Sequence, residues 1–128
     1  MRRVETGGLG DPTTGGSSYL GEAIGGAGDF VGNYIDMRDA NTIGGDKYFH
    51  CKANCEAAQR GVGGKDAAQC ISDTREWVDQ NWKGDPASAS AADQAANQYG
   101  RSQGEANPNG NCAKLCAPFR PNGLPTQY

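Results

Sequence analysis

The chain has 128 residues, 20 of them glycine, and a formal net charge of −3 that gives a pI of about 5.0. An acidic chain of this kind lacks the basic face that nonspecific nucleic-acid binding needs, so we expect no nucleic-acid partner. No stretch of the sequence approaches the roughly 20 consecutive apolar residues that a membrane-spanning helix requires.

The expected hydrophobic core is small for a chain whose length fits one domain. Leu, Ile, Val and Phe together number only 15, and alanine supplies much of the 36% hydrophobic content. Stabilisation scales with buried apolar area, at roughly 25 cal/mol per Å². We therefore expect a folded domain that depends on cross-links, a ligand or an oligomer for part of its stability.

The first 17 residues have the composition of a linker. Residues 6–18 read TGGLGDPTTGGSS, and the opening Met1-Arg2-Arg3 is followed by no apolar signal-peptide core. This pattern predicts a flexible extension at residues 1–17 and a folded domain at residues 18–128. Either the chain has a native start, or it is the C-terminal domain of a larger protein.

A helix over residues 18–40 is predicted by apolar residues at helical spacing. Five glycines in this stretch each cost up to about 1 kcal/mol relative to alanine, so packing must hold the helix together. We expect its apolar stripe to form core, a seam between copies of the chain, or a face for a lipid or other ligand. The stripe consists of Leu20, Ile24, Ala27, Val31 and Tyr34.

Two more helices are predicted in the middle of the chain. The first covers residues 46–60, with Asp46 as a candidate N-cap and Gly61 directly after the last turn. A short loop at residues 62–64 separates it from the second, at residues 65–82. Loops this short place consecutive helices antiparallel.

The last predicted helix is rich in alanine and covers residues 88–99, with Gly100 as its stop. Beyond it glycine, proline and asparagine dominate, which predicts an irregular tail at residues 101–128 with one helical turn at 111–116. The expected fold class is therefore all-α: a four-helix bundle with an irregular C-terminal tail wrapping the helices.

Four of the five cysteines form two CxxxC pairs, Cys51 with Cys55 and Cys112 with Cys116. Spacing i, i+4 places both sulfur atoms of a pair on one helical face. We expect two parallel disulfides that join the tail turn to the second helix, closing loops of roughly 60 residues and contributing about 4 kcal/mol. The spacing leaves the connectivity open, as well as two alternatives, a four-thiolate zinc site and free thiols. Cys70 is expected to be a small buried residue.

His50 is the only histidine, and it lies beside Cys51 and four residues after Asp46. In a catalytic interpretation, these three residues would form a set that contains a nucleophile and its base. Adjacent residues on a helix point about 100° apart, so His50 and Cys51 cannot easily meet. We therefore expect a structural His50, hydrogen-bonded to a loop or to the tail, with a ligand-binding or pH-sensing role as the alternative.

The third predicted helix carries both polar and aromatic residues. A solvated helix face is the simplest interpretation of Asp73, Arg75 and Glu76, with a polar binding site as the alternative. Trp77 and Trp82 are expected to pack in the core, and a ligand pocket is the alternative.

Several colinear blocks between residues 18 and 128 resemble the serum amyloid A family. The blocks are long and occur in the family's order. They are Gly45-Asp46-Lys47-Tyr48-Phe49-His50, Ile71-Ser72-Asp73, Ala92-Asp93-Gln94-Ala95-Ala96-Asn97, Gly100-Arg101-Ser102, Phe119-Arg120-Pro121 and Gly123-Leu124-Pro125.

The resemblance implies a four-helix bundle wrapped by its tail, and a protein that is not an enzyme and needs no cofactor or metal. Family members bind lipid, lipoprotein particles, retinol and heparin-like polyanions, usually as oligomers. The match makes Arg60 and Arg75 candidates for polyanion binding and Phe119 and Arg120 candidates for anchoring the tail.

The chain departs from the vertebrate pattern in two places. Gly28 and Gly32 stand where the family has arginines, and residues 105–118, with both tail cysteines, are an insertion. Vertebrate members lack cysteines. If the disulfides form, the protein works in a secreted, extracellular setting.

Three functions are compatible with these features. The first is a non-enzymatic binding module that serves as the C-terminal effector of a secreted bacterial Rhs-type toxin, with a lipid or membrane surface, an immunity protein or a homo-oligomer as partner. The second is an extracellular lipid or retinoid carrier like the animal members of the family. The third is an enzymatic toxin that uses His50 and Cys51.

Overall fold

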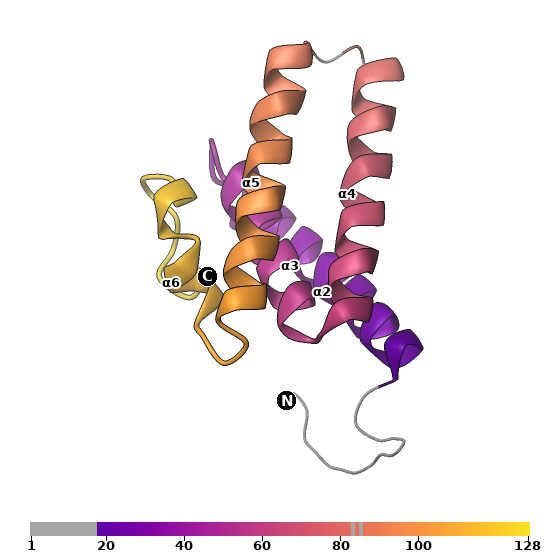
Figure 1. Ribbon diagram of the computed structural model, residues 1–128. Coiled ribbons are helices and arrows are strands. Elements are labelled where there is room, and N and C mark those ends of the chain that lie inside the picture. The colour runs from indigo at the N-terminus through magenta and orange to yellow at the C-terminus, as the bar shows by residue number, and fades with distance from the viewer. Residues whose placement is uncertain (1–17, 83, 85) are drawn as a thin grey trace.

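The computed structural model describes residues 18–82, 84 and 86–128, and within these ranges it contains helices and no strands. The elements are α2 (Tyr19–Ala40), α3 (Asp46–Gln59), α4 (Val62–Asn81), α5 (Ala87–Ala106), α6 (Cys112–Leu115) and the 3-10 turn η1 (Ala117–Phe119). This confirms the predicted all-α class with four packed helices and a short tail (Figure 1). The linker predicted at residues 1–17 lies outside the described residues.

Helix α3 is the centre of the fold and contacts α2, α4, α5, α6 and η1. Helices α4 and α5 stand side by side, with α2 and α3 crossing behind them and the tail against α5 (Figure 1). Nine of the 14 residues of α3 are buried, which is why so short a helix can organise the domain. They are Tyr48, Phe49, His50, Cys51, Ala53, Asn54, Cys55, Ala57 and Ala58.

Glycines set the close approach of α5 to α3. A Cβ atom on Gly100 would overlap the carbonyl oxygen of Cys51, and one on Gly104 would overlap that of Cys55. The expected helix stop at Gly100 was therefore wrong, because α5 continues through both glycines to Ala106. The irregular part of the tail accordingly begins after Ala106 and not at residue 101.

The start of α4 also differs from the prediction. The expected loop at residues 62–64 is the first turn of α4, which begins at Val62. Gly61 precedes it with φ at +125°, and the Glu22 carboxylate of α2 accepts a hydrogen bond of 2.9 Å from the Gly63 backbone N–H. An acidic side chain at a helix N-terminus satisfies a free donor and complements the helix dipole, so a side chain 41 residues away starts this helix.

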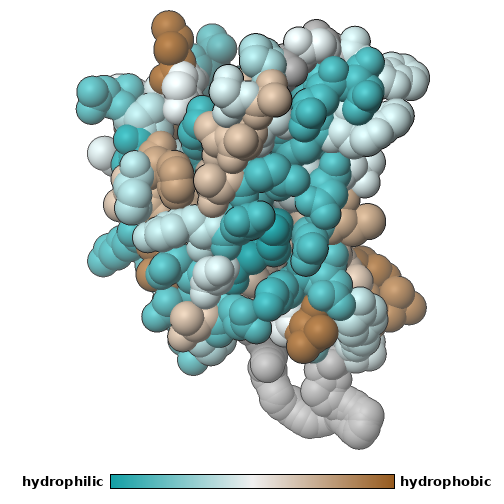
Figure 2. Space-filling view, turned by 45° about the horizontal axis from the view of Figure 1, so that its top comes forward, coloured by the Kyte–Doolittle hydropathy of each residue, from teal (hydrophilic) through white to brown (hydrophobic). Residues whose placement is uncertain are grey.

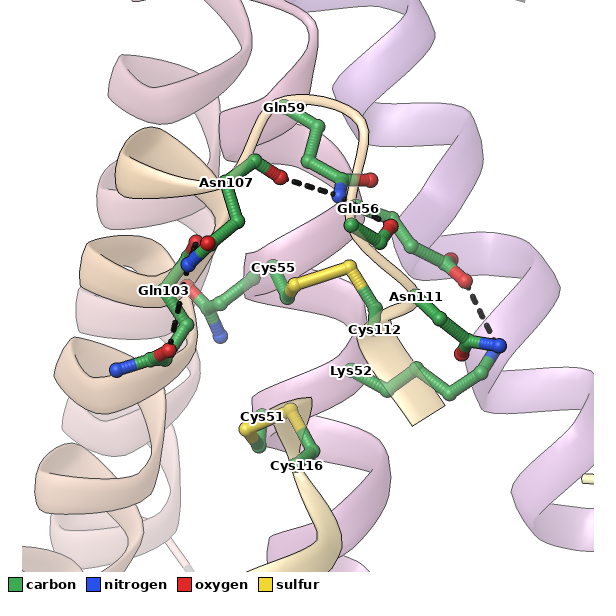
Figure 3. Close-up of a disulfide and its surroundings, with 12 residues drawn as sticks. Cys51, Lys52, Cys55, Glu56, Gln59, Gln103, Asn107, Asn111, Cys112 and Cys116 are labelled. Atoms are coloured by element: carbon green, nitrogen blue, oxygen red, sulfur yellow. Dashed lines mark hydrogen bonds and ion pairs between the residues drawn. A yellow bond between two sulfur atoms is a disulfide. The ribbon is translucent and has the colours of Figure 1, made fainter. Parts of the chain in front are cut away.

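Two disulfides join α3 to the tail, as the CxxxC pairs predicted. Cys51 is bonded to Cys116 and Cys55 to Cys112, with sequence separations of 65 and 57 residues (Figure 3). The zinc and free-thiol alternatives for these four residues were therefore wrong. The bridges form part of the core cluster, together with Tyr48, Phe49 and Leu124.

The predicted tail anchor, Phe119 and Arg120, lies against this cluster. The Arg120 guanidinium donates hydrogen bonds to the Pro125 and Tyr128 carbonyl oxygens at 2.9 and 2.8 Å and to the Tyr48 hydroxyl at 3.2 Å. The Phe119 ring meets Tyr99 of α5 edge to face, with 5.4 Å between ring centroids. The arginine thereby folds the last residues back over α3.

The outward face of α4 contains three residues that we expected to find inside. Cys70 is an exposed free thiol, and Trp77 and Trp82 are 58% and 79% exposed, so the prediction that they are buried was wrong. The buried face of α4 consists of small or polar residues, and at its first turn the backbones of α2 and α3 approach Gly63 and Gly64 closely.

Candidate ligand-binding cavity

The apolar stripe of α2 is a surface feature and not part of the core. Leu20, Ile24 and Val31 are each more than 60% exposed, Tyr34 is 46% exposed, and Ala27 is half-buried. Of the uses expected for this stripe, the structure therefore excludes the core. On the face shown in Figure 2, hydrophobic side chains reach the surface in separate groups among polar ones.

A cavity of about 360 Å³ opens beside the inner edge of this stripe. Four helices line it, and although residues with polar side chains from α3, α4 and α5 contribute to the lining, the accessible wall is almost entirely apolar. A smaller hollow of about 20 Å³ adjoins it and shares Phe30, Tyr34, His50 and Arg75. The main cavity is lined by Ala27, Phe30, Val31, Tyr34, His50, Ile71, Ser72, Arg75, Glu76 and Asn97.

Glu76 is the most unusual polar residue of the cavity wall, because it is only 3% exposed. Its Oε1 accepts a hydrogen bond of 2.5 Å from the Ser90 hydroxyl, which in turn accepts one of 2.8 Å from the Gln80 amide. Its Oε2 is buried and has no hydrogen-bond partner among the described residues. Burial raises the pKa of Glu76, since it disfavours the charged carboxylate. The expectation of a solvated face was therefore wrong for this residue.

His50 and Arg75 lie on the same wall. His50 is buried, and its burial, followed by the positive charge of Arg75, lowers its pKa, so the imidazole is neutral at neutral pH. The Arg75 Nε lies 3.9 Å from the Asp79 carboxylate, and about a third of its side chain is exposed. His50, Arg75 and Glu76 therefore contribute to the lining mainly through their carbon atoms, because the accessible wall of the cavity is almost entirely apolar.

Below the cavity a buried polar network joins three helices. Asn54 of α3 donates to Asn97 of α5 at 2.9 Å, and its Oδ1 accepts from Arg101 at 2.9 Å and from Ser72 of α4 at 3.2 Å. A fully hydrogen-bonded buried network specifies one arrangement of the helices. It therefore fixes the positions of Ser72 and Asn97, which belong both to this network and to the lining of the cavity.

The two arginines proposed for polyanion binding have different surroundings. Arg60 donates from Nε and Nη2 to the two carboxylate oxygens of Asp29, at 2.6 and 3.0 Å. This bidentate pair occupies the two guanidinium N–H groups that would otherwise bind a sulfate or carboxylate. Arg75 instead lines the cavity beside Asp79. Both arginines are thus engaged by carboxylates of the chain itself.

The structure contradicts the catalytic interpretation of Asp46, His50 and Cys51. Cys51 is fully buried and bonded to Cys116, so in this structure it has no thiolate that could attack a substrate. Among the described residues, no group of three or more His, Cys, Asp and Glu side chains is placed to hold a metal ion.

Comparison with known proteins shows which family the sequence matches. Residues 17–128 match the family model described as serum amyloid A protein. The chain belongs to the serum amyloid A family. Serum amyloid A-2 of Oryctolagus cuniculus and serum amyloid A-1 of Homo sapiens are each 50% identical over 111 residues, covering 87% of this chain and 82% of theirs. The serum amyloid A protein of Anas platyrhynchos is 44% identical over 122 residues, or 92% of this chain and 85% of its own.

These relatives are vertebrate proteins, and they give no support to the expected bacterial Rhs-type setting. They favour a function like that of the animal members of the serum amyloid A family over that of a bacterial toxin. Within the described residues, no helix is long and apolar enough to cross a membrane.

The sequence predicted part of the α2 side of the cavity and did not predict the residues that other helices contribute. Ala27, Val31 and Tyr34 were identified by their spacing, whereas Phe30, Ile71 and Asn97 also line the cavity and were not singled out as ligand contacts. Phe30 lies four residues before Tyr34, so the helical spacing could have included it. Glu76 could be found only from its burial, since its sequence neighbours are typical of a solvated helix.

Proposed function

We propose that this member of the serum amyloid A family is a non-enzymatic binding module whose cavity holds the apolar part of an amphipathic small molecule in an extracellular setting. One observation carries the proposal: a cavity of about 360 Å³ between four helices whose accessible wall is almost entirely apolar. Ligand pockets in proteins are mostly apolar, have volumes of about 300–1,000 Å³ and contain a few convergent polar groups.

The exposed stripe of α2 supports the same function, because it continues the apolar wall out to the surface. Val31 and Tyr34 line the cavity and are themselves exposed, so the stripe and the cavity wall share these two residues. Contiguous exposed apolar side chains mark sites for ligands, membranes or protein partners. The two disulfides support an oxidising, extracellular compartment.

Retinol binding followed by fluorescence, and flotation with phosphatidylcholine vesicles, test this function. We expect Val31→Asp to abolish retinol binding, because it places a charge on the apolar wall. Ile43→Asp is the matched control, since Ile43 is 96% exposed and lies outside the cavity. Absence of retinol and vesicle binding from a protein that stays monomeric in light scattering would contradict the proposal.

A homo-oligomer that buries the α2 stripe is the second candidate, favoured by the exposure of Leu20 and Ile24. The same light-scattering measurement distinguishes the two. Association that is lost in Leu20→Ser with Ile24→Ser, while retinol binding persists, would assign the outer stripe to a second copy and leave the cavity to the ligand.

A further inference from the structure

We propose that Asn122 is a site of spontaneous deamidation and that its isoaspartyl product weakens the attachment of the C-terminal tail. The basis is a comparison within the chain, because the sequence Pro-Asn-Gly occurs twice, at residues 108–110 and at residues 121–123. Asparagine is prone to deamidation when glycine follows it, since glycine has no side chain to hinder ring closure and moves freely. The two copies therefore start from the same local chemistry, and only their surroundings differ.

The reaction needs the turn itself and water. The backbone nitrogen of Gly123 attacks the side-chain Cγ atom of Asn122, and the new C–N bond closes a five-membered succinimide ring. The side-chain amide leaves as ammonia and takes up the proton that the backbone nitrogen loses. Water then opens the ring at either of its carbonyl carbons, which gives aspartate or isoaspartate. The rate depends on how freely the glycine N–H can lose its proton and turn toward the asparagine side chain.

At residues 108–110 the attacking nitrogen is held in place. The Gly110 N–H donates a hydrogen bond of 2.9 Å to the Asn107 carbonyl oxygen, and the Gly110 carbonyl accepts one of 2.8 Å from the Gln59 amide. The same amide donates to the Asn107 carbonyl (Figure 3). A Cβ atom on Gly110 would lie 3.0 Å from two neighbouring side chains, so the space around it is filled. Ring closure at this copy must first break a hydrogen bond.

At residues 121–123 the corresponding nitrogen is not held. The Gly123 N–H donates to no acceptor among the described residues, and a Cβ atom on Gly123 would meet nothing within 4 Å. Asn122 and Gly123 are both exposed, and the Asn122 side chain also makes no hydrogen bond within the described part of the chain. The amide and the nitrogen that must meet are therefore both available.

This turn lies within the loop that the tail anchor closes. Arg120 donates to the Pro125 carbonyl oxygen at 2.9 Å, and Leu124 belongs to the buried core cluster. An isoaspartyl residue at position 122 adds one carbon atom to the main chain between Arg120 and these two contacts, and it adds a carboxylate. A loop of this length cannot take up the extra atom and keep both contacts unchanged. We expect the last residues of the chain to become looser.

Peptide mapping of protein incubated at mildly alkaline pH measures both sites in one sample. After reduction and alkylation, trypsin cuts after Lys114 and places Asn109 and Asn122 in separate peptides. In the folded protein we expect Asn122 to deamidate about tenfold faster than Asn109, the factor expected when one hydrogen bond must first be broken. In protein unfolded with guanidinium and reductant, the two rates should converge, because the two tripeptides are the same.

Asn122→Ser and Asn109→Ser are matched variants for a second readout, methylation of the aged folded protein by an isoaspartate methyltransferase. Most of the methylation should be lost in Asn122→Ser and retained in Asn109→Ser. Equal deamidation of the two sites in the folded protein, or methylation that persists in Asn122→Ser, would overturn the assignment of the site.

The effect on the tail is measured by trimming with carboxypeptidase. The isoaspartyl protein gains a negative charge and is separated from fresh protein by ion exchange. We expect it to lose Tyr128 faster than fresh protein does, because Arg120 holds the Tyr128 carbonyl oxygen at 2.8 Å. Asn122→Asp is the control, since it adds the same charge without lengthening the main chain, and it should be trimmed at the rate of fresh protein. Equal trimming of the isoaspartyl and fresh proteins would overturn the effect on the tail.

Discussion

The two sides of α3 are built on different principles. On the tail side, α3 meets aromatic rings, two disulfides and the Arg120 hydrogen bonds in one buried cluster. On the α2 side, it meets glycines and small residues, and the largest apolar side chains of α2 point to solvent or into a cavity. We therefore expect the stability of the fold to depend mainly on the first side, and we propose the second side for binding, so substitutions on the two sides should have different consequences.

Removing both disulfides should have the largest effect. Replacing Cys51, Cys55, Cys112 and Cys116 by alanine opens a loop of about 60 residues, and we expect a loss of about 4 kcal/mol in the free energy of unfolding, measured with guanidinium. Replacing only Cys51 and Cys116 should cost much less, because the other bridge still closes nearly the same loop. Equal losses from one pair and from both would contradict the loop-closure explanation. Cys70→Ala, which changes an exposed free thiol, should stay within about 0.5 kcal/mol.

Gly100→Ala should have the second-largest effect, because the new methyl group would overlap the Cys51 carbonyl oxygen and push α5 away from α3. We expect a loss of about 1–3 kcal/mol, the usual cost of overpacking, despite the higher helix propensity of alanine. Guanidinium unfolding measures it, and the circular dichroism of the folded variant checks that α5 persists. A neutral or stabilising result would mean that α5 can shift without loss.

Much of the fold follows from sequence because its elements have local signals. Apolar spacing and caps predict four helices, and the two CxxxC pairs predict covalent attachment of the tail. Glycine misleads in two places, at Gly100 and at Gly63-Gly64. A glycine that ends a helix and one that lets another backbone approach look the same in a sequence, and only the positions of the carbonyl groups of α2 and α3 distinguish them.

The cavity was predictable only in part, for a related reason. Helical spacing identifies the α2 side of the wall, because one helix creates that pattern. The rest of the lining includes His50, Arg75, Glu76 and Asn97, which come from three other helices. The burial of Glu76 depends on how closely α4 and α5 pack, which no local sequence pattern encodes.

Glu76→Gln removes a buried charge while keeping the shape of the side chain, so we expect a gain in the free energy of unfolding on the order of 1 kcal/mol at neutral pH. Because the folded state raises the Glu76 pKa, it binds more protons than the unfolded state at pH values between the ordinary and the raised pKa. Stability contributed by this site therefore falls as pH rises through that window. Unfolding measured across this range should show a difference between wild type and variant that grows with pH and then levels off. A pH-independent difference would mean that Glu76 titrates alike in both states.

Gly28→Ala should have the smallest effect and the opposite sign to Gly100→Ala. A Cβ atom on Gly28 meets nothing within 4 Å, so the variant gains helix propensity with no clash, and the unfolding free energy should rise by about 0.5–1 kcal/mol. The substitution also tests what covers α2 in solution, because Gly28 lies on the exposed side of that helix. If a second copy packs its backbone against Gly28, the added methyl group will weaken association in light scattering even as the monomer becomes more stable. Unchanged association together with higher stability would mean that this side of α2 stays exposed to solvent. The proposed binding would then be restricted to the edge of the cavity.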